Sequence, residues 1–179
     1  MKALILNGSP RKGNTCTITE ALKKGFENLK DVQVKEIMAD RVSVSPCIAC
    51  DQCGCEGNCV SDDDTNDVLK EVMEADMIVF ATPVYWWGIT AQLKLIIDKF
   101  YAQSSNLHNQ QKKIGVITVG EAEQSEPQYK LISDQFACIC DYLGWNLVCS
   151  KSYTATAADE LKKETDSVKE IEGLWECFA

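Results

Sequence analysis

The chain has 179 residues, of which 45% are hydrophobic and 25% charged, and its formal net charge is −9. This length predicts a single domain over residues 1–179, and an acidic balance without a basic cluster disfavours nucleic acid and anionic membranes as partners. Because the chain lacks both a signal peptide and any apolar run near the roughly 20 residues of a membrane span, we expect a cytoplasmic protein.

Strand-like and helix-like segments alternate along the chain. Apolar or alternating patterns predict strands at 2–6, 32–37, 77–81, 113–119 and 146–150. Apolar residues at helical spacing follow each strand, and Ser61 or Asp62 can cap the second helix. This alternation predicts an α/β fold, in which helices cover both faces of a parallel sheet. The alternating second strand suits an edge, so we predict a flavodoxin-like three-layer α/β/α sandwich with five parallel strands in the order 2-1-3-4-5.

The loop after the first strand, "NGSPRKGNTCT", lies where ligands bind in such folds. Its spacing matches a Walker A loop, except that Asn14 stands where the phosphate-bridging lysine is required. Helix amides, the Ser9 and Thr15 hydroxyls, the Asn14 amide and Arg11 could still hold one terminal phosphate. The alternative is a tight turn whose glycines and proline only shape the backbone. Because G-x-G-x-x-G is absent, the loop fits a mononucleotide better than a dinucleotide.

The loop after the third strand, within "ATPVYWWGITAQLK" (81–94), would face the first loop across the sheet edge. Pro83 presets a turn, Tyr85, Trp86 and Trp87 offer aromatic faces, and Gly88 permits close approach of the backbone. A flat tricyclic ring needs such walls. Core or oligomer contacts are the alternative reading of these aromatic residues. Together the two loops predict flavin mononucleotide (FMN).

The segments "GSPRKGNT" and "TPVYWWGITAQLKLIIDKF" resemble the NAD(P)H-dependent FMN reductase branch of the flavodoxin-like superfamily. This resemblance implies an FMN pocket built by the loops after the first, third and fourth strands. The implied phosphate contacts are Ser9, Arg11, Asn14, Thr15 and Cys16. The implied isoalloxazine contacts are Pro83, Val84, Tyr85, Trp86, Trp87 and Gly88, and the pocket is completed by Val119, Gly120 and Glu121.

Five of the ten cysteines fall in one loop, "PCIACDQCGCEGNC". The C-x2-C-x2-C-x5-C spacing of Cys47, Cys50, Cys53 and Cys59 is closer to an iron-sulfur motif than to the paired knuckles of a zinc site. It is similar to the compact motif of the iron-sulfur flavoproteins, which implies a 4Fe-4S cluster. Cys55 competes for the role of fourth ligand, and free or redox-active thiols are the alternative. The other cysteines in predicted helices and strands are expected to be small buried hydrophobic residues.

These features predict an FMN-binding oxidoreductase that passes electrons between FMN and a 4Fe-4S cluster. His108 is the only histidine and has no partners for a catalytic triad, so we predict no catalytic side chain. The resemblance implies a homodimer or homotetramer, with NAD(P)H or a ferredoxin-like protein as redox partner. One alternative is a cluster-free NAD(P)H-dependent FMN or quinone reductase. A second is a non-enzymatic cysteine-loop module that binds a metal and a partner protein.

Overall fold

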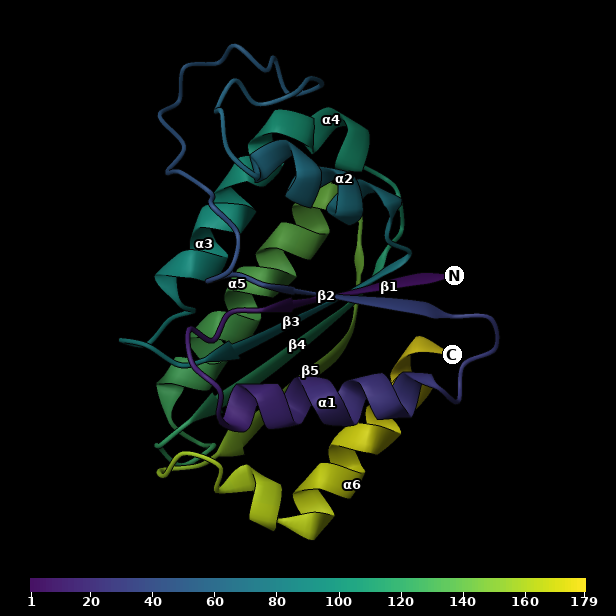
Figure 1. The fold of residues 1–179 in the computed structure, drawn as a ribbon, viewed down its shortest axis with the longest axis vertical. Coiled ribbons are helices and arrows are strands. Elements are labelled where there is room, and N and C mark those ends of the chain that lie inside the picture. The colour runs from purple at the N-terminus through teal and green to yellow at the C-terminus, as the bar shows by residue number, and fades with distance from the viewer.

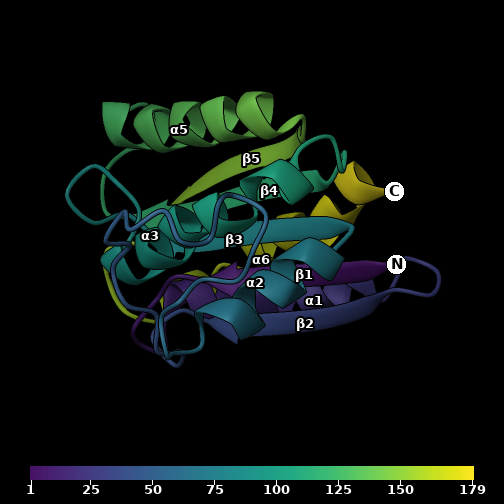
Figure 2. The same ribbon diagram turned by 90° about the horizontal axis from the view of Figure 1, so that it is seen from above.

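A five-stranded parallel sheet forms the centre of the computed structural model, which describes all residues from Met1 to Ala179. The strand order is β2-β1-β3-β4-β5, and all neighbouring strands run parallel (Figures 1 and 2). The predicted sandwich and strand order are therefore confirmed. The strands are β1 (Lys2–Asn7), β2 (Gln33–Met38), β3 (Met77–Pro83), β4 (Lys113–Gly120) and β5 (Asn146–Thr154).

Helices cover both faces of the sheet, as Figure 1 shows. The upper layer in that view holds α2 (Thr65–Glu74), α3 (Ala91–Asp98), α4 (Ser104–Leu107) and α5 (Pro127–Leu143), with the 3-10 helix η1 (Lys99–Gln103) between α3 and α4. The lower layer holds α1 (Asn14–Phe26) and α6 (Thr165–Gly173), with the 3-10 helices η2 (Leu161–Lys163) and η3 (Leu174–Phe178). Each layer closes its own hydrophobic core against the sheet.

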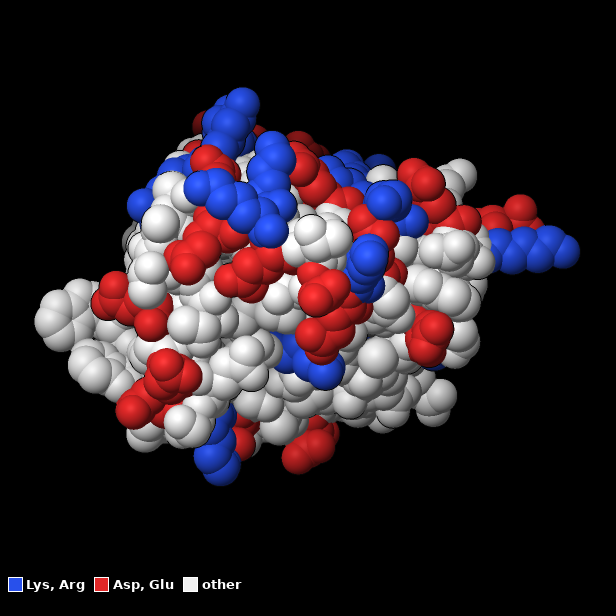
Figure 3. Space-filling view, turned by 90° about the horizontal axis from the view of Figure 1, so that it is seen from below, with Lys and Arg blue, Asp and Glu red and all other residues white.

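The sheet is apolar on both faces because both are covered. Phe80 of β3 packs against Phe136 of α5, with ring centroids 4.6 Å apart. On the opposite face, Phe26 of α1 meets Phe178 of η3 edge-on at 5.2 Å. Acidic and basic side chains are interspersed on the surface seen from below in Figure 3. No helix of the chain is both long and apolar enough to cross a lipid bilayer.

Several local predictions were wrong. Neither Ser61 nor Asp62 caps α2, which begins at Thr65 with Asp64 as its N-cap residue. The Ser61 hydroxyl instead accepts a hydrogen bond from Lys99, a contact between residues far apart in the sequence. The helix predicted after the third strand breaks into α3, η1 and α4, and Tyr101 of η1 is exposed. The terminal helix is divided in the same way.

A long irregular segment, residues 39–64, connects β2 to α2 and contains the cysteine-rich loop. Connections of this length are uncommon in compact folds and are usually functional. The segment lies over η1 and α4 and forms hydrogen bonds with both of them. Ser105 N donates to Cys55 O at 3.1 Å, and Gln103 Nε2 donates to Gly57 O at 3.0 Å. The Tyr101 hydroxyl donates to Asp51 Oδ1 at 2.7 Å.

Candidate functional site

A cleft of about 570 Å³ opens at the edge of the sheet where the strands end. The loops after β1, β3, β4 and β5 form it, at the left end of the sheet in Figure 1. The predicted residues that line it are Ser9, Arg11, Asn14, Thr15, Pro83, Val84, Tyr85, Trp86, Trp87, Val119, Gly120 and Glu121. The structure thus brings all but two of the predicted cofactor residues around one cavity.

The start of α1 gives one end of the cleft an excess of hydrogen-bond donors. The backbone amides of Gly13, Asn14, Thr15 and Cys16 donate to no acceptor in the protein, and no side chain caps the helix. Such amides, together with the positive end of the helix dipole, bind anions. The Thr15 hydroxyl faces the same cavity without a hydrogen-bond partner in the protein. Arg11 adds an exposed guanidinium that pairs with no carboxylate.

Two of the predicted phosphate contacts are engaged elsewhere by their side chains. The Asn14 side chain donates to Ala157 O at 2.9 Å and accepts from Leu161 N at 3.1 Å, so it joins α1 to the segment after β5. The Ser9 hydroxyl donates to Arg11 O at 2.8 Å and shapes the loop. These two side chains shape the loop, while the unpaired amides, Thr15 and Arg11 line the cleft without partners in the protein.

Aromatic residues form the other end of the cleft. Tyr85 and Gly88 pair as a two-residue hairpin whose tip is Trp86 and Trp87, with φ angles of 48° and 61°. This left-handed backbone is strained for bulky residues, which are rarely found there. Trp86 is 92% exposed, and its ring centroid lies 6.0 Å from that of Trp87. The fold therefore holds two large aromatic side chains at the mouth of the cleft instead of burying them.

Cys16 and Gly88 do not line the cleft. The Cys16 thiol lines a separate, strongly charged cavity beside Lys23 and Glu36, on the other side of the loop, where it donates to Arg11 O at 3.7 Å. Gly88 is occupied by its two backbone hydrogen bonds to Tyr85. The cleft also has four lining residues that the sequence motifs missed: Ala122, Gln128, Ala155 and Thr156. The position of β5 beside β4 could have indicated the last two, since its carboxyl end meets the same sheet edge.

The cleft therefore suits a ligand with an anionic group at one end and a flat ring at the other. At Gly120 a Cβ would lie 3.2 Å from Val84 Cβ and 3.0 Å from the Tyr129 hydroxyl, so a larger residue there would force its neighbours to move. The residues present fit FMN by their chemistry: unpaired amides and a cation for a phosphate, and apolar walls for a tricyclic ring.

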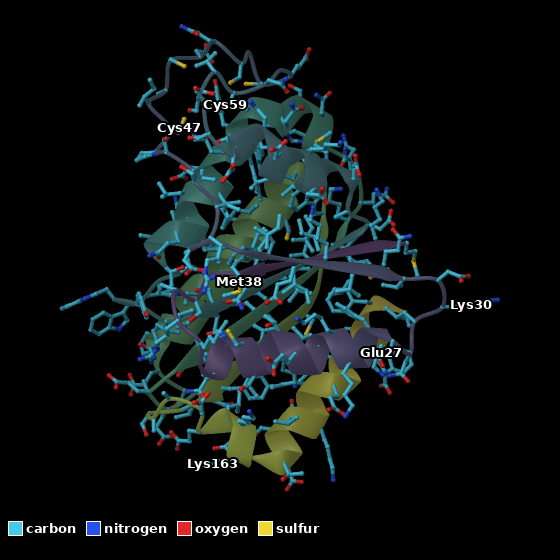
Figure 4. The ribbon with its side chains drawn as sticks, in the orientation of Figure 1. Glu27, Lys30, Met38, Cys47, Cys59 and Lys163 are labelled. Carbon is cyan, nitrogen blue, oxygen red and sulfur yellow. The ribbon has the colours of Figure 1, made fainter.

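The cysteine-rich loop surrounds a second, small cavity of about 30 Å³. Cys47, Cys50, Cys53 and Cys59 all line it, whereas Cys55 does not. Figure 4 shows Cys47 and Cys59 at the top of the molecule, in the loop above α3 and α4. In the structure the set predicted from spacing therefore faces one cavity, and the competing cysteine lies outside it.

The backbone of this loop is unusually rich in left-handed residues. Ala49, Asp51, Gly54 and Cys55 have φ angles of 51°, 58°, 58° and 65°. Alternation of right- and left-handed residues turns successive amides toward one side and creates anion-binding concavities of the kind found at iron-sulfur sites. The amides of residues 47–53 donate to no acceptor in the protein. The donor set therefore fits an iron-sulfur cluster in its chemistry.

The thiols themselves are not arranged as a metal centre. No group of three or more His, Cys, Asp or Glu side chains in the chain is placed so that it could hold a metal ion. At Cys59, burial opposes ionisation, but hydrogen bonds with Ser61 and Lys99 outweigh it and lower the pKa of the thiol. Among the remaining cysteines, Cys140 and Cys149 are buried as expected, whereas Cys138 and Cys177 are exposed.

Comparison with known proteins identifies a matching family and several relatives. A model of the family described as NADPH-dependent FMN reductase matches residues 1–139. An iron-sulfur flavoprotein of Methanocaldococcus jannaschii is 35% identical over 122 residues, and one of Archaeoglobus fulgidus is 36% identical over 100 residues. These alignments cover 67% and 55% of this chain, but only 62% and 45% of those two proteins. The chain thus spans about half the length of the curated relatives it matches.

Solved structures share the fold. An FMN-dependent NADH-azoreductase from Bacillus anthracis in complex with FMN superposes with a TM-score of 0.70 at 13% identity, covering 100% of both chains. An NAD(P)H:quinone oxidoreductase from Methanothermobacter marburgensis gives a TM-score of 0.68 at 13% identity, covering 97% of this chain and 94% of that one. At such low identity these similarities establish the fold alone.

Proposed function

The chain belongs to the NADPH-dependent FMN reductase family, and we propose that it binds FMN in the cleft and acts as a flavin-dependent oxidoreductase. The observation that carries this proposal is the distribution of groups along the cleft. Unpaired amides and Arg11 stand at one end, and Tyr85, Trp86 and Trp87 stand at the other. A mononucleotide with an aromatic ring satisfies both ends at once.

Each part of the cleft has a distinct role in this proposal. The amides of residues 13–16, Thr15 and Arg11 hold the phosphate, and the aromatic tip covers the ring and excludes water. Glu121 and Gln128 supply polar groups beside the apolar walls. Bound FMN supplies the redox chemistry, since flavins accept hydride and exchange single electrons. The protein provides orientation and electrostatics, and no side chain is required to transfer a proton.

We further propose that Cys47, Cys50, Cys53 and Cys59 hold a 4Fe-4S cluster. Their shared cavity, the unpaired amides of the loop and the iron-sulfur flavoprotein name of the relatives support this assignment. The chain would then exchange electrons between FMN and the cluster, with NAD(P)H or a ferredoxin-like protein as partner. Residues 1–179 would act as one FMN-binding domain in a homodimer or homotetramer.

A second candidate function is a cluster-free NAD(P)H-dependent reductase of flavins or quinones. The arrangement of the thiols favours it, because they do not form a group that could hold a metal ion. In this case the loop would serve as a structured surface above α3 and α4, and the cleft would act alone.

Anaerobic purification separates the two functions. The first requires stoichiometric FMN together with iron and sulfide, whereas the second requires FMN without iron. Cys50→Ser should abolish iron binding and spare FMN, and Cys138→Ser, an exposed cysteine outside the loop, serves as the matched control. Failure of the apoprotein to quench the fluorescence of added FMN would refute the flavin proposal itself.

A further inference from the structure

Lys99, directly after α3, is an unusual lysine. It is only 3% exposed, although lysine is almost never fully buried without a paired charge. Its ammonium forms no ion pair with any carboxylate. Burying such a cation costs free energy unless its N–H donors find hydrogen-bond acceptors. The acceptors of Lys99 therefore show which part of the molecule holds it.

The only hydrogen-bond acceptors of Lys99 are two groups of the cysteine-rich loop. Its Nζ donates to Ser61 Oγ at 2.9 Å and to Cys59 Sγ at 3.4 Å. Both acceptors lie at the end of the cysteine-rich loop, and Cys59 is the only proposed cluster ligand that Lys99 contacts.

Lys99 also belongs to the same cavity as the proposed ligands. It lines the cavity with Cys47, Cys50, Cys53 and Cys59. Cys55 does not line this cavity. The one buried lysine of this cavity therefore shares its lining with the four proposed ligands and contacts one of their sulfurs.

We propose that Lys99 is a positioning residue for the iron-sulfur site, which hydrogen-bonds the Cys59 sulfur and stabilises added negative charge on a cluster held there. The inference rests on the proposed function. An electron passed from reduced FMN, the donor in the proposed function, would make the net charge of such a cluster more negative by one, with no bond formed or broken. Net charge and hydrogen bonds to sulfur set the potential of such clusters, so the ammonium should raise it.

The test compares three variants after anaerobic reconstitution with iron and sulfide. Lys99→Met removes the charge and the donor, Lys99→Arg restores both, and Lys70→Met removes an exposed lysine of α2 that lies outside the cavity and forms no ion pair. Redox titration followed by electron paramagnetic resonance measures the cluster potential. We expect Lys99→Met to shift the reduction equilibrium at least tenfold toward the oxidised form, which is about 59 mV for one electron. Lys99→Arg should recover most of this shift, and Lys70→Met should cause none.

A cluster in Lys99→Met that titrates at the wild-type potential would overturn this inference alone. Wild-type protein without stoichiometric iron would instead refute the cluster part of the proposed function, and this inference with it. If the methionine variant does not fold, Lys99→Gln gives the same test, because it keeps a hydrogen-bond donor and loses the charge. The predicted result for Lys99→Gln is a shift in the same direction.

Discussion

The Thr90 hydroxyl donates a 2.7 Å hydrogen bond to the carbonyl oxygen of Gly8, and so joins the loop after β3 to the loop after β1. The oxygen of the Thr90 hydroxyl also accepts a hydrogen bond from Leu93 N at 3.4 Å and so caps α3. Gly8 must be a glycine for this contact, because a Cβ there would lie 2.9 Å from Thr90 Oγ1. Both walls of the cleft are therefore positioned through one buried hydroxyl.

Thr90→Ala should lower the free energy of unfolding by about 1 to 2 kcal/mol, because it removes a helix cap and leaves the Gly8 carbonyl without its partner. Urea denaturation of the apoprotein measures the loss. Thr90→Ser keeps the hydroxyl and is the matched control. Equal stability of the alanine and serine variants would contradict the structural role of this bond.

Arg11→Ala should weaken FMN binding roughly tenfold to a hundredfold, since a hydrogen bond to a charged group contributes about 1.5 to 3 kcal/mol. Fluorescence titration of the apoprotein with FMN gives the dissociation constant. Arg41→Ala is the natural control, because Arg41 is exposed, lies outside the cleft and is the only other arginine. The phosphate assignment is wrong if the two variants bind FMN equally well.

Replacement of Trp86 and Trp87 by Asn and Gly should separate stability from function. The hairpin tip requires left-handed φ angles at both positions, and Asn-Gly adopts them readily. Relief of strain should stabilise the apoprotein by about 1 to 2 kcal/mol. FMN affinity should fall at the same time, because the aromatic wall is lost. Urea denaturation and FMN titration on the same variant measure both effects, and a destabilised variant would show that the tip is not strained.

The carboxylate of Glu36 should make stability depend on pH. Burial opposes its ionisation, but hydrogen bonds from Lys23 at 2.7 Å and Asn7 at 3.0 Å outweigh burial and lower the pKa of Glu36. A lowered pKa in the folded state means that the contribution is fully present above the unfolded pKa of about 4.3. It is lost as the pH falls through the folded value.

Glu36→Gln tests this sign. The variant should lose unfolding free energy relative to wild type at pH 7, and the difference should shrink as the pH falls below about 4. Urea denaturation at several pH values measures it. Glu20→Gln, an exposed acid of α1 outside any ion pair, controls for general charge effects. A difference independent of pH would exclude the carboxylate as its source.

The fold could be predicted from the sequence because each element carries its own local pattern. Apolar segments indicated β1, β3 and β4, and an alternating segment indicated β2. The predicted start of each of these strands lies within a residue or two of the observed start. The ends were harder to predict, since β5 continues to Thr154 through polar residues that form ladder bonds with β4. Periodicity reports burial, and an exposed stretch of strand gives no such signal.

The candidate site was predictable where sequence motifs coincide with strand ends. The loops after β1 and β3 were found in this way, whereas Ala155 and Thr156 were missed because nothing in "TATAADE" signals a ligand. Lys99 could not be found at all from the sequence. At the end of a helix a lysine is ordinarily a solvated charge, and only the packing of residues 59 and 61 against it shows that it is buried.

Helix α3 fixes the distance and the rotation between two contacts, the hydrogen bond from Thr90 to Gly8 and the hydrogen bond from Lys99 to Cys59. α3 begins directly after Thr90 and ends directly before Lys99, so these contacts occupy opposite ends of a rod about 13 Å long. Inserting a single residue would turn one contact by about 100° relative to the other. Only changes of a whole helical turn would keep both contacts oriented. Moving the cysteine-rich loop into a related protein would therefore require α3 to be transferred together with the loop.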